Sequence, residues 1–323
     1  MRTRTKSLLL TGAAVFLASA LPAPRSTGVL PGEFGIPPNP SGSFPACGAC
    51  HDPNPNANGV VKVEITPQLL SVDAGGTVPV SARVTGGPGL GLGGFCMETS
   101  AGRFQAGTNT RTTPAGDAIT HLDKFGNSWA FTYTAPNTPG VVRWTAAGQS
   151  VNADLAPTGD SFGFYGPNSG QPGVPLRLYV NAPAVGGFGA GCAGLDGHQP
   201  VLGASRSATI GASFDTELVS VFPGAFTFCA LGDSATAFGT LPLPFDLAIL
   251  GAPNCLVRCS HLFTQSAAAP GQGSGGGRAV FSWPLPNDPG LRGATLFFQA
   301  FVLDPAANSL GLAVSNGLKA QIQ

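Results

Sequence analysis

The feature that most constrains the fold is a repeated alternation of apolar and polar residues, interrupted at short intervals by glycine and proline. Val61, Val63 and Ile65 alternate with polar neighbours, and further alternating series run over 78–84, 129–133 and 176–180. A period of two predicts strands with one buried face, and the 47 Gly and 30 Pro supply the turns between them. The sequence therefore predicts an all-β fold, an antiparallel immunoglobulin-like β-sandwich followed by a second all-β domain.

The composition argues against nucleic acid as a partner. Charged residues make up 10% of the chain, and 16 basic residues balance 16 acidic ones. Loss of residues 1–20 would remove three basic groups and leave 13 basic against 16 acidic, a net charge of about −3. We therefore expect no nucleic-acid partner. The 43% of hydrophobic residues, 21 Phe among them, indicates packed cores in spite of the glycine and proline.

Residues 1–20 have the pattern of a secretory signal peptide. A basic start (Arg2, Arg4, Lys6) precedes an apolar centre and a small-residue end at Ala18-Ser19-Ala20. The apolar run is too short for a membrane span, and no later segment approaches the length required. We expect an exported protein without a membrane span, located in the periplasm, at the cell surface or outside the cell.

The run Cys47-Gly48-Ala49-Cys50-His51 carries the most specific chemistry in the chain. In a C-x-x-C-H motif two thiols add to the vinyl groups of a haem, and the adjacent imidazole becomes an axial ligand of the iron. The motif predicts one covalent haem c on Cys47 and Cys50, with His51 as a ligand. Two alternatives stay open: a Cys47–Cys50 disulfide with an ordinary histidine beside it, and a zinc site.

The second axial ligand must come from elsewhere. His121 and Met97 lie in the same predicted domain, and we take His121 as the candidate and Met97 as the weaker alternative. A methionine ligand would raise the haem potential relative to two histidines. Met97 shares a strand face with Phe95, which favours core packing. Trp129, Phe131, Tyr133 and Trp144 are expected in the core of the sandwich rather than around a haem.

The remaining cysteines divide between the two halves. Four lie in the second half, at Cys192, Cys229, Cys255 and Cys259, and an exported domain with four cysteines predicts two disulfides of undetermined connectivity. Cys96 is expected to be a buried thiol. Phosphate-loop, dinucleotide and nucleophile-elbow motifs are absent from the sequence, so no enzymatic activity is expected.

The chain divides by composition into six segments. They are a signal peptide (1–20), a Pro/Gly-rich lead-in (21–45), the haem-attachment segment (46–57), the sandwich (58–183), a Gly-rich linker (184–191) and a C-terminal β domain (192–323).

Residues 26–183 contain several short sequence motifs, here called stations. Their order resembles that in the Reeler-like, choice-of-anchor V domains of exported bacterial proteins, in which a C-x-x-C-H segment precedes a β-sandwich. The family's usual histidine lies where His121 stands. The stations are Gly94-Phe95, Ala101–Phe104, Thr120-His121, Trp129–Pro136, Val142–Ala147 and Gly159-Asp160. The resemblance implies the sandwich architecture and supports His121 as a site residue.

Residues 188–323 resemble a C-terminal module of unknown function common in exported proteins of planctomycete-like bacteria. The matching stations are Pro284–Pro289, Leu291–Thr295, Gln299-Ala300, Asp304 and Ser315–Leu318.

Two hypotheses follow for the function. The first is an exported c-type haem protein that works in electron transfer or redox sensing, with an unknown redox protein or surface component as partner. The second is a haem-free secreted surface or matrix protein that binds glycan or protein partners, with Cys47–Cys50 as a staple. Covalent haem on Cys47 and Cys50 distinguishes them.

Overall fold

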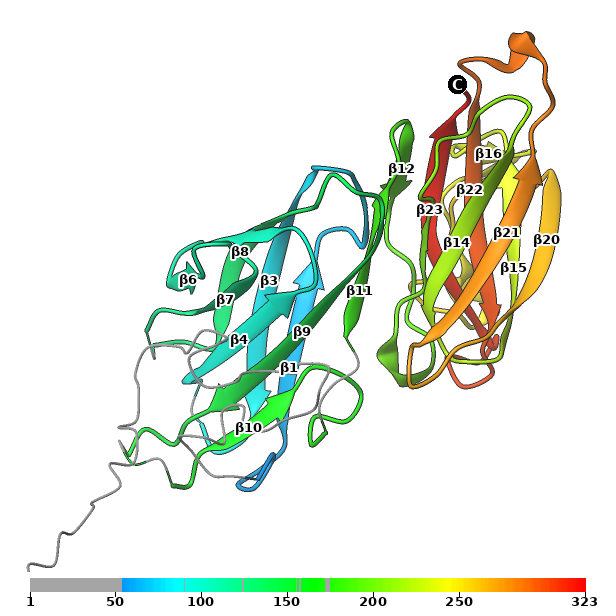
Figure 1. Ribbon diagram of the computed structural model, residues 1–323. Coiled ribbons are helices and arrows are strands. Elements are labelled where there is room, and N and C mark those ends of the chain that lie inside the picture. The colour runs from blue at the N-terminus through cyan, green and yellow to red at the C-terminus, as the bar shows by residue number, and fades with distance from the viewer. Residues whose placement is uncertain (1–53, 90, 124, 155, 157, 172–174) are drawn as a thin grey trace, which may run out of the picture.

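The structure is a computed structural model that describes residues 54–323 except 90, 124, 155, 157 and 172–174. The predictions for the signal peptide and for Cys47, Cys50 and His51 concern residues outside this range. The described chain is all-β, as the sequence predicted: its strands form two domains, shown side by side in Figure 1. Its helices are short 3₁₀ turns, and none of them is long and apolar enough to cross a membrane.

The first domain is a sandwich of two sheets. One sheet has the order β1-β3-β8-β5, and the other has the order β2-β11-β9-β4-β7-β6, with β10 paired to β9. The strands of the first sheet are β1 (Val61–Pro67), β3 (Thr77–Gly86), β8 (Ser128–Thr134) and β5 (Arg103–Gln105). Those of the second are β2 (Ser71–Asp73), β11 (Leu176–Asn181), β9 (Gly140–Ser150), β4 (Gly93–Thr99), β7 (Ala118–His121), β6 (Thr110–Thr112) and β10 (Ser161–Phe164).

The second domain is also built from facing sheets. A five-stranded sheet has the order β12-β23-β22-β15-β20, and a three-stranded sheet has the order β13-β14-β21. The strands of the larger sheet are β12 (Val185–Phe188), β23 (Leu312–Gln321), β22 (Thr295–Leu303), β15 (Ala225–Gly232) and β20 (Phe263–Ala269). The smaller sheet contains β13 (Val201–Gly203), β14 (Ser213–Val221) and β21 (Gly277–Pro284). Two short hairpins and three 3₁₀ turns complete the domain: β16 (Ala237–Phe238) with β17 (Leu241–Pro242), β18 (Phe245–Asp246) with β19 (Leu256–Val257), and η2 (Leu195–Gly197), η3 (Leu247–Leu250) and η4 (Pro289–Leu291).

The alternating residues fill the core of the first domain. Trp129, Phe131, Tyr133 and Trp144 are all at most 5% exposed, and they pack with the valines of β1 and β3. Tyr133 donates its hydroxyl hydrogen to the carbonyl of Ala101 at 2.5 Å, which satisfies its polar end. The aromatic residues are therefore core residues, as expected.

The domain boundary differs from the prediction. Residues 185–188, expected in a Gly-rich linker, form strand β12, which pairs with β23 at the edge of the second domain. Gly187 lies so close to β2 of the first domain that a β-carbon at this position would overlap the Ser71 carbonyl. The glycines therefore permit a close approach of two domains rather than a flexible connection.

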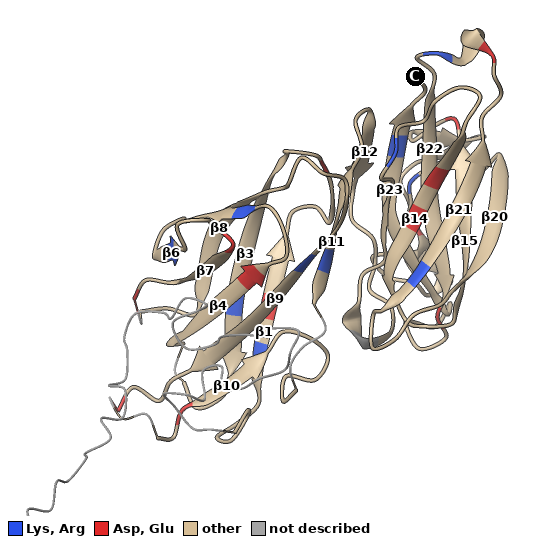
Figure 2. Ribbon diagram, in the orientation of Figure 1, with Lys and Arg blue, Asp and Glu red and all other residues tan. Residues whose placement is uncertain are grey.

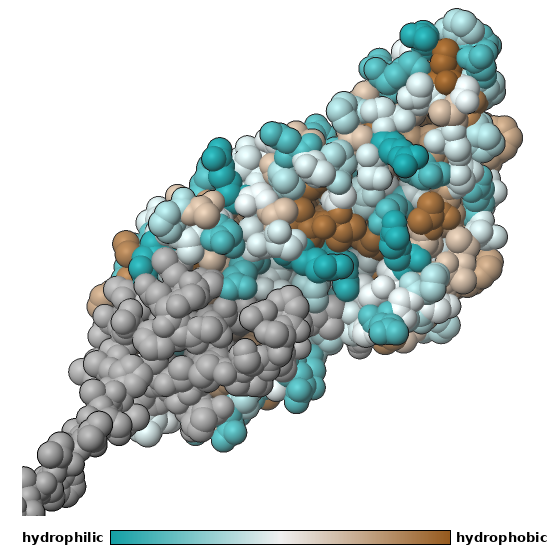
Figure 3. Space-filling model, in the orientation of Figure 1, coloured by the Kyte–Doolittle hydropathy of each residue, from teal (hydrophilic) through white to brown (hydrophobic). Residues whose placement is uncertain are grey.

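A buried polar network joins the domains at the same place. Asn181, fully buried, donates to Ser71 Oγ at 2.9 Å and to the Val72 carbonyl at 3.1 Å, and accepts from the Ala204 amide at 3.0 Å. Tyr179 packs beside Val201 and Val219 of the second domain in a separate apolar cluster. Figure 3 shows apolar residues at the surface along the boundary between the domains.

The prediction of two disulfides in the second domain is half right. Cys192 and Cys255 are bonded, which links the start of the domain to the segment after η3. Cys229 and Cys259 are buried thiols, so the second predicted disulfide is wrong. Both sit inside the hydrophobic core, and burial raises the pKa of Cys259 to about 12. Cys96 is a buried thiol, as expected.

Candidate ligand site around His121

His121 ends strand β7 and is held by the neighbouring strand β4. Its Nδ1 lies 3.1 Å from the amide nitrogen and 3.0 Å from the carbonyl oxygen of Phe95. Thr120 Oγ1 donates to the same carbonyl at 2.7 Å. When Nδ1 carries the proton it donates to the Phe95 carbonyl, and Nε2 then has the lone pair that a metal would need. In the other tautomer Nδ1 accepts from the Phe95 amide and Nε2 carries the proton.

Three segments that lie far apart in the sequence meet around His121. Its ring lies over the α-carbon of Gly94, where any side chain would overlap the imidazole. The ring centroid of Trp129 lies 6.0 Å away, and Trp129 in turn packs on Phe95 at 4.7 Å. The Gly94-Phe95, Thr120-His121 and Trp129 stations therefore meet at one half-buried histidine.

Met97 is not part of this arrangement. Its side chain is fully buried in the core of the first domain, on the face of β4 that also carries Phe95. Its position agrees with core packing and leaves His121 as the better ligand candidate.

The first described residues are fixed to the same sheet. The amide of Asn56 donates to the Phe162 carbonyl at 2.8 Å, and the side chain of Asn58 donates to the Asp160 carbonyl at 2.7 Å. The Asn56 side chain accepts from the Val61 amide at 2.9 Å. The chain that follows the C-x-x-C-H motif is therefore anchored on β10.

A row of paired residues leads from this anchor toward His121. Phe162 of β10 pairs with Gln149 of β9, which pairs with Gly94 of β4, and β4 pairs with β7. Three strand spacings, about 14 Å, separate β10 from β7, and Asn56 bonds to the outer edge of β10, one spacing further, so about 19 Å separate Asn56 from β7. His51 precedes Asn56 by five residues, which a fully extended chain covers in about 17 Å. The covalent chain thus allows His51 to reach the neighbourhood of His121.

Gln149 lies in the middle of this row with an unsatisfied donor. Its side chain is 9% exposed, and its Nε2 is buried without a hydrogen-bond partner. A buried amide hydrogen without an acceptor costs free energy, so such atoms mark places where a further acceptor can bind. The beginning of the row is apolar, because Phe162, Phe164 and Ala147 form a small buried cluster there.

The other two described histidines serve local structure. His198 is buried, and its Nε2 lies 2.7 Å from Ser274 Oγ in the glycine-rich 271–277 loop. His261 bonds to Thr264 at 2.6 Å and stacks on Phe301. Among the described residues, no cluster of three metal-ligating side chains is present.

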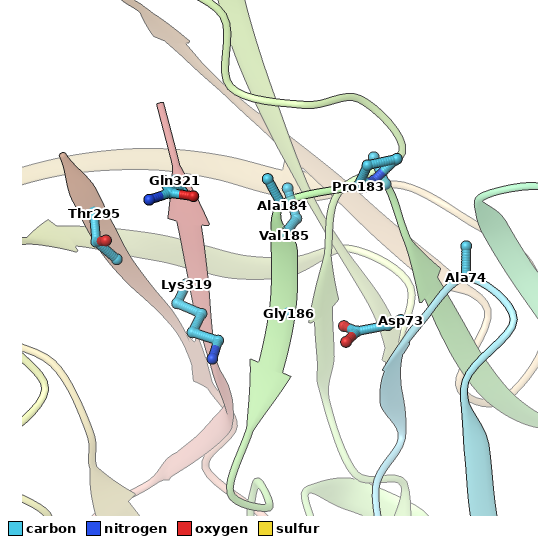
Figure 4. A pocket seen from close by; sticks show the side chains of 10 residues that line it. Asp73, Ala74, Pro183, Ala184, Val185, Gly186, Thr295, Lys319 and Gln321 are labelled. Carbon is cyan, nitrogen blue, oxygen red and sulfur yellow. The ribbon is translucent and has the colours of Figure 1, made fainter. Parts of the chain in front are cut away.

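A pocket of about 570 Å³ lies at the domain junction. It is lined by Asp73 and Ala74 of the first domain, by residues 182–186, and by Thr295, Lys319 and Gln321 (Figure 4). Both charged residues are exposed, on opposite sides of β12. Neither of the described ligand candidates, His121 and Met97, lines it.

Comparisons with known proteins add no family. No protein-family model matches the chain, and no characterised protein matches it. Among solved structures, the adhesin InvE of Yersinia pseudotuberculosis aligns at 12% identity over 84% of this chain and 60% of that one, with a TM-score of 0.20. The Escherichia coli adhesin FdeC aligns at 11% identity over 81% of this chain and 64% of that one, also with a TM-score of 0.20. The chain spans less than two thirds of either structure.

Proposed function

We propose that the chain is an exported c-type haem protein of Reeler-like architecture that works in electron transfer or redox sensing outside the cytoplasm. One observation carries the proposal: His121, whose Nδ1 is engaged by the Phe95 backbone, lies within chain reach of the Cys47–His51 motif. Metal-bound histidines commonly have their other ring nitrogen held in this way.

The residues around His121 fit a haem. Cys47 and Cys50 would hold it by thioether bonds, and His51 and His121 would bind its iron. The unpartnered Nε2 of Gln149 adds a buried donor on the same row, suited to a haem carboxylate or another acceptor. When bound, the haem would supply one-electron redox chemistry, and two histidine ligands would favour electron transfer over binding of small molecules at the iron.

Export is supported by the second domain as well as by the N-terminal sequence. The Cys192–Cys255 disulfide belongs to an oxidising compartment. Haem attachment to C-x-x-C-H motifs and disulfides are both compatible with a location outside the cytoplasm. The partner would be a redox protein or a component of the cell surface.

The haem-free alternative has its own supporting observation. The Phe95 amide approaches His121 Nδ1 with the geometry of a donor, and this bond needs no metal. In that case His121 would be a structural residue that closes the end of β7, and Cys47 and Cys50 would form a disulfide. The protein would then be a secreted binding module for glycan or protein partners.

Absorption spectra of the exported protein test the proposal. The protein is produced in a host with cytochrome c maturation, denatured, and examined as the reduced pyridine complex, beside a variant with both Cys47→Ala and Cys50→Ala. The proposal expects a covalent c-type band that the double variant lacks. A colourless wild-type protein with a Cys47–Cys50 disulfide by mass would overturn it and support the alternative.

A second measurement tests the ligand. His121→Ala should keep the covalent haem and change the native spectrum from six-coordinate low-spin to five-coordinate or high-spin iron. His261→Ala, in the second domain, is the matched control and should leave the spectrum unchanged. A His121→Ala spectrum identical to wild type would exclude His121 as the ligand.

A further inference from the structure

Two arginines stand opposite each other on the outer face of the larger sheet of the first domain. Arg143 of β9 is the antiparallel partner of Arg177 of β11. Their neighbours Val142, Trp144 and Leu178 point into the core, so alternation places both arginines on the opposite face. Figure 2 shows basic segments on β9 and β11. Directly opposed side chains begin about 5 Å apart, so the two guanidinium groups can reach a common ligand.

This arrangement is unfavourable for the protein by itself. Like charges directly opposite each other on neighbouring strands destabilise a sheet. Arg177 is half-buried, and its Nη1 is buried without a hydrogen-bond partner. Burial, and then the charge of Arg143, lower the pKa of Arg177. A buried donor without an acceptor costs more free energy on a charged group than on a neutral one. An anionic group bound between the two arginines would remove this cost.

The described acidic residues nearby do not supply such an anionic group. Among them, no carboxylate forms an ion pair with either arginine. Glu98 lies on the same face, opposite Thr145, but burial and Asp117 raise its pKa to about 7, which favours its neutral form. Glu217, beyond the domain junction, is already engaged by Arg278 at 2.7 Å.

We propose that Arg143 and Arg177 form a binding site for an oxyanion, a carboxylate or sulfate group carried by an acidic polysaccharide. Guanidinium groups bind such oxygens in pairs, and Arg177 Nη1 provides a donor already positioned for one of them. Arg143 is exposed on a strand, so a long polymer can approach the sheet there. Six residues of β9 separate Arg143 from Gln149, about 20 Å, so this site is distinct from that around His121.

Binding of charged and neutral polymers tests the site. The mature, exported chain is titrated by calorimetry with polygalacturonate, dextran sulfate, unmodified dextran and sodium sulfate alone. We expect the two charged polymers to bind and unmodified dextran not to bind. The variant with Arg143→Gln and Arg177→Gln should bind them at least tenfold more weakly. Arg83→Gln, an exposed arginine on β3 of the other sheet, is the matched control and should bind like wild type.

The outcomes separate the sources of the anion. Binding of sodium sulfate as tightly as either polymer, and its loss in the double variant, would keep the oxyanion site but exclude the polysaccharide. Equal affinities of wild type, the double variant and Arg83→Gln would overturn the proposal, as would binding of unmodified dextran or the absence of binding to every probe. Removal of opposed charges should not lower the melting temperature, so a loss of binding with an unchanged melting temperature excludes unfolding as its cause.

Discussion

The imidazole of His121 lies over the α-carbon of Gly94, and no side chain larger than hydrogen fits between them. Gly94 therefore determines the position of the histidine as directly as the Phe95 backbone does. The contact joins two strands, because Gly94 belongs to β4 and His121 ends β7.

Gly94→Ala should displace His121 and destabilise the first domain. Insertion of a methyl group into a packed site costs about 1–3 kcal/mol. Urea denaturation followed by tryptophan fluorescence measures this, and Gly170→Ala is the control, since a β-carbon there meets only side-chain atoms at 3.3 Å. In the haem-loaded protein the same variant should lose the spectrum of its sixth ligand. Equal stability of the two variants would contradict the packing argument.

Asn181→Leu should weaken the domain junction. The substitution removes two donated hydrogen bonds and leaves the Ala204 amide without its acceptor, at a cost of about 2–3 kcal/mol. Calorimetry should show the unfolding of the two domains moving apart in temperature. Asn287→Leu, an exposed position in the second domain, should change neither transition. A single unshifted transition in Asn181→Leu would show that other contacts dominate the junction.

Glu98 should make the first domain less stable as the pH rises. Burial, with a smaller contribution from Asp117, raises its pKa from 4.5 to about 7 in the folded protein. The folded state therefore favours the protonated form, and the stability that this proton contributes is present below pH 4.5 and lost as the pH rises through 7. Glu98→Gln should flatten the dependence of the urea midpoint on pH between 4.5 and 7.

The control for Glu98 is Glu64→Gln, which removes an exposed acid that pairs with Lys62 at 2.8 Å. That variant should retain the wild-type pH dependence over the same interval. A wild-type urea midpoint that rises between pH 4.5 and 7, with the same slope in Glu98→Gln, would contradict the assignment to Glu98.

Loss of the Cys192–Cys255 bond should destabilise the second domain. The bonded residues are 63 positions apart, and closure of a loop of that length in the unfolded chain corresponds to about 4 kcal/mol. A variant with Cys192→Ala and Cys255→Ala should show this loss in guanidinium denaturation. Thiol titration provides the control: in the wild-type protein Cys229 and Cys259 should react with a thiol reagent only after denaturation, because both are buried. A reaction in the native protein would contradict their burial.

The sequence predicted the fold where side-chain alternation was strong. Val61, Val63 and Ile65 do point into the core. A strand with one buried and one solvent-exposed face must alternate apolar and polar residues. The linker prediction was wrong for a physical reason: Gly186 and Gly187 have the composition of a flexible connection, but Gly187 is needed for its contact with Ser71. Composition does not distinguish a glycine that makes the backbone flexible from one that permits two segments to approach closely.

The site was predictable only in part. His121 could be proposed from a resemblance of short sequence motifs, but its bonds to the Phe95 backbone depend on the register of β4 against β7. The same limit applies to Arg143 and Arg177, which lie 34 positions apart and become neighbours only when β9 pairs with β11. Disulfide pairing is a further case, because four cysteines allow three connectivities and also allow thiols to remain reduced.

The close contact of β12 with β2 also sets the position of one domain relative to the other. A strand that belongs to the second domain lies against the first, and Asn181 bonds across the same junction, so several contacts oppose bending of the chain there. An attachment made through the second domain would hold the His121 end of the first at a fixed distance and direction. The pair of domains would then act as a rigid spacer, and lengthening residues 182–184 with flexible sequence should abolish that control of distance while both folds survive.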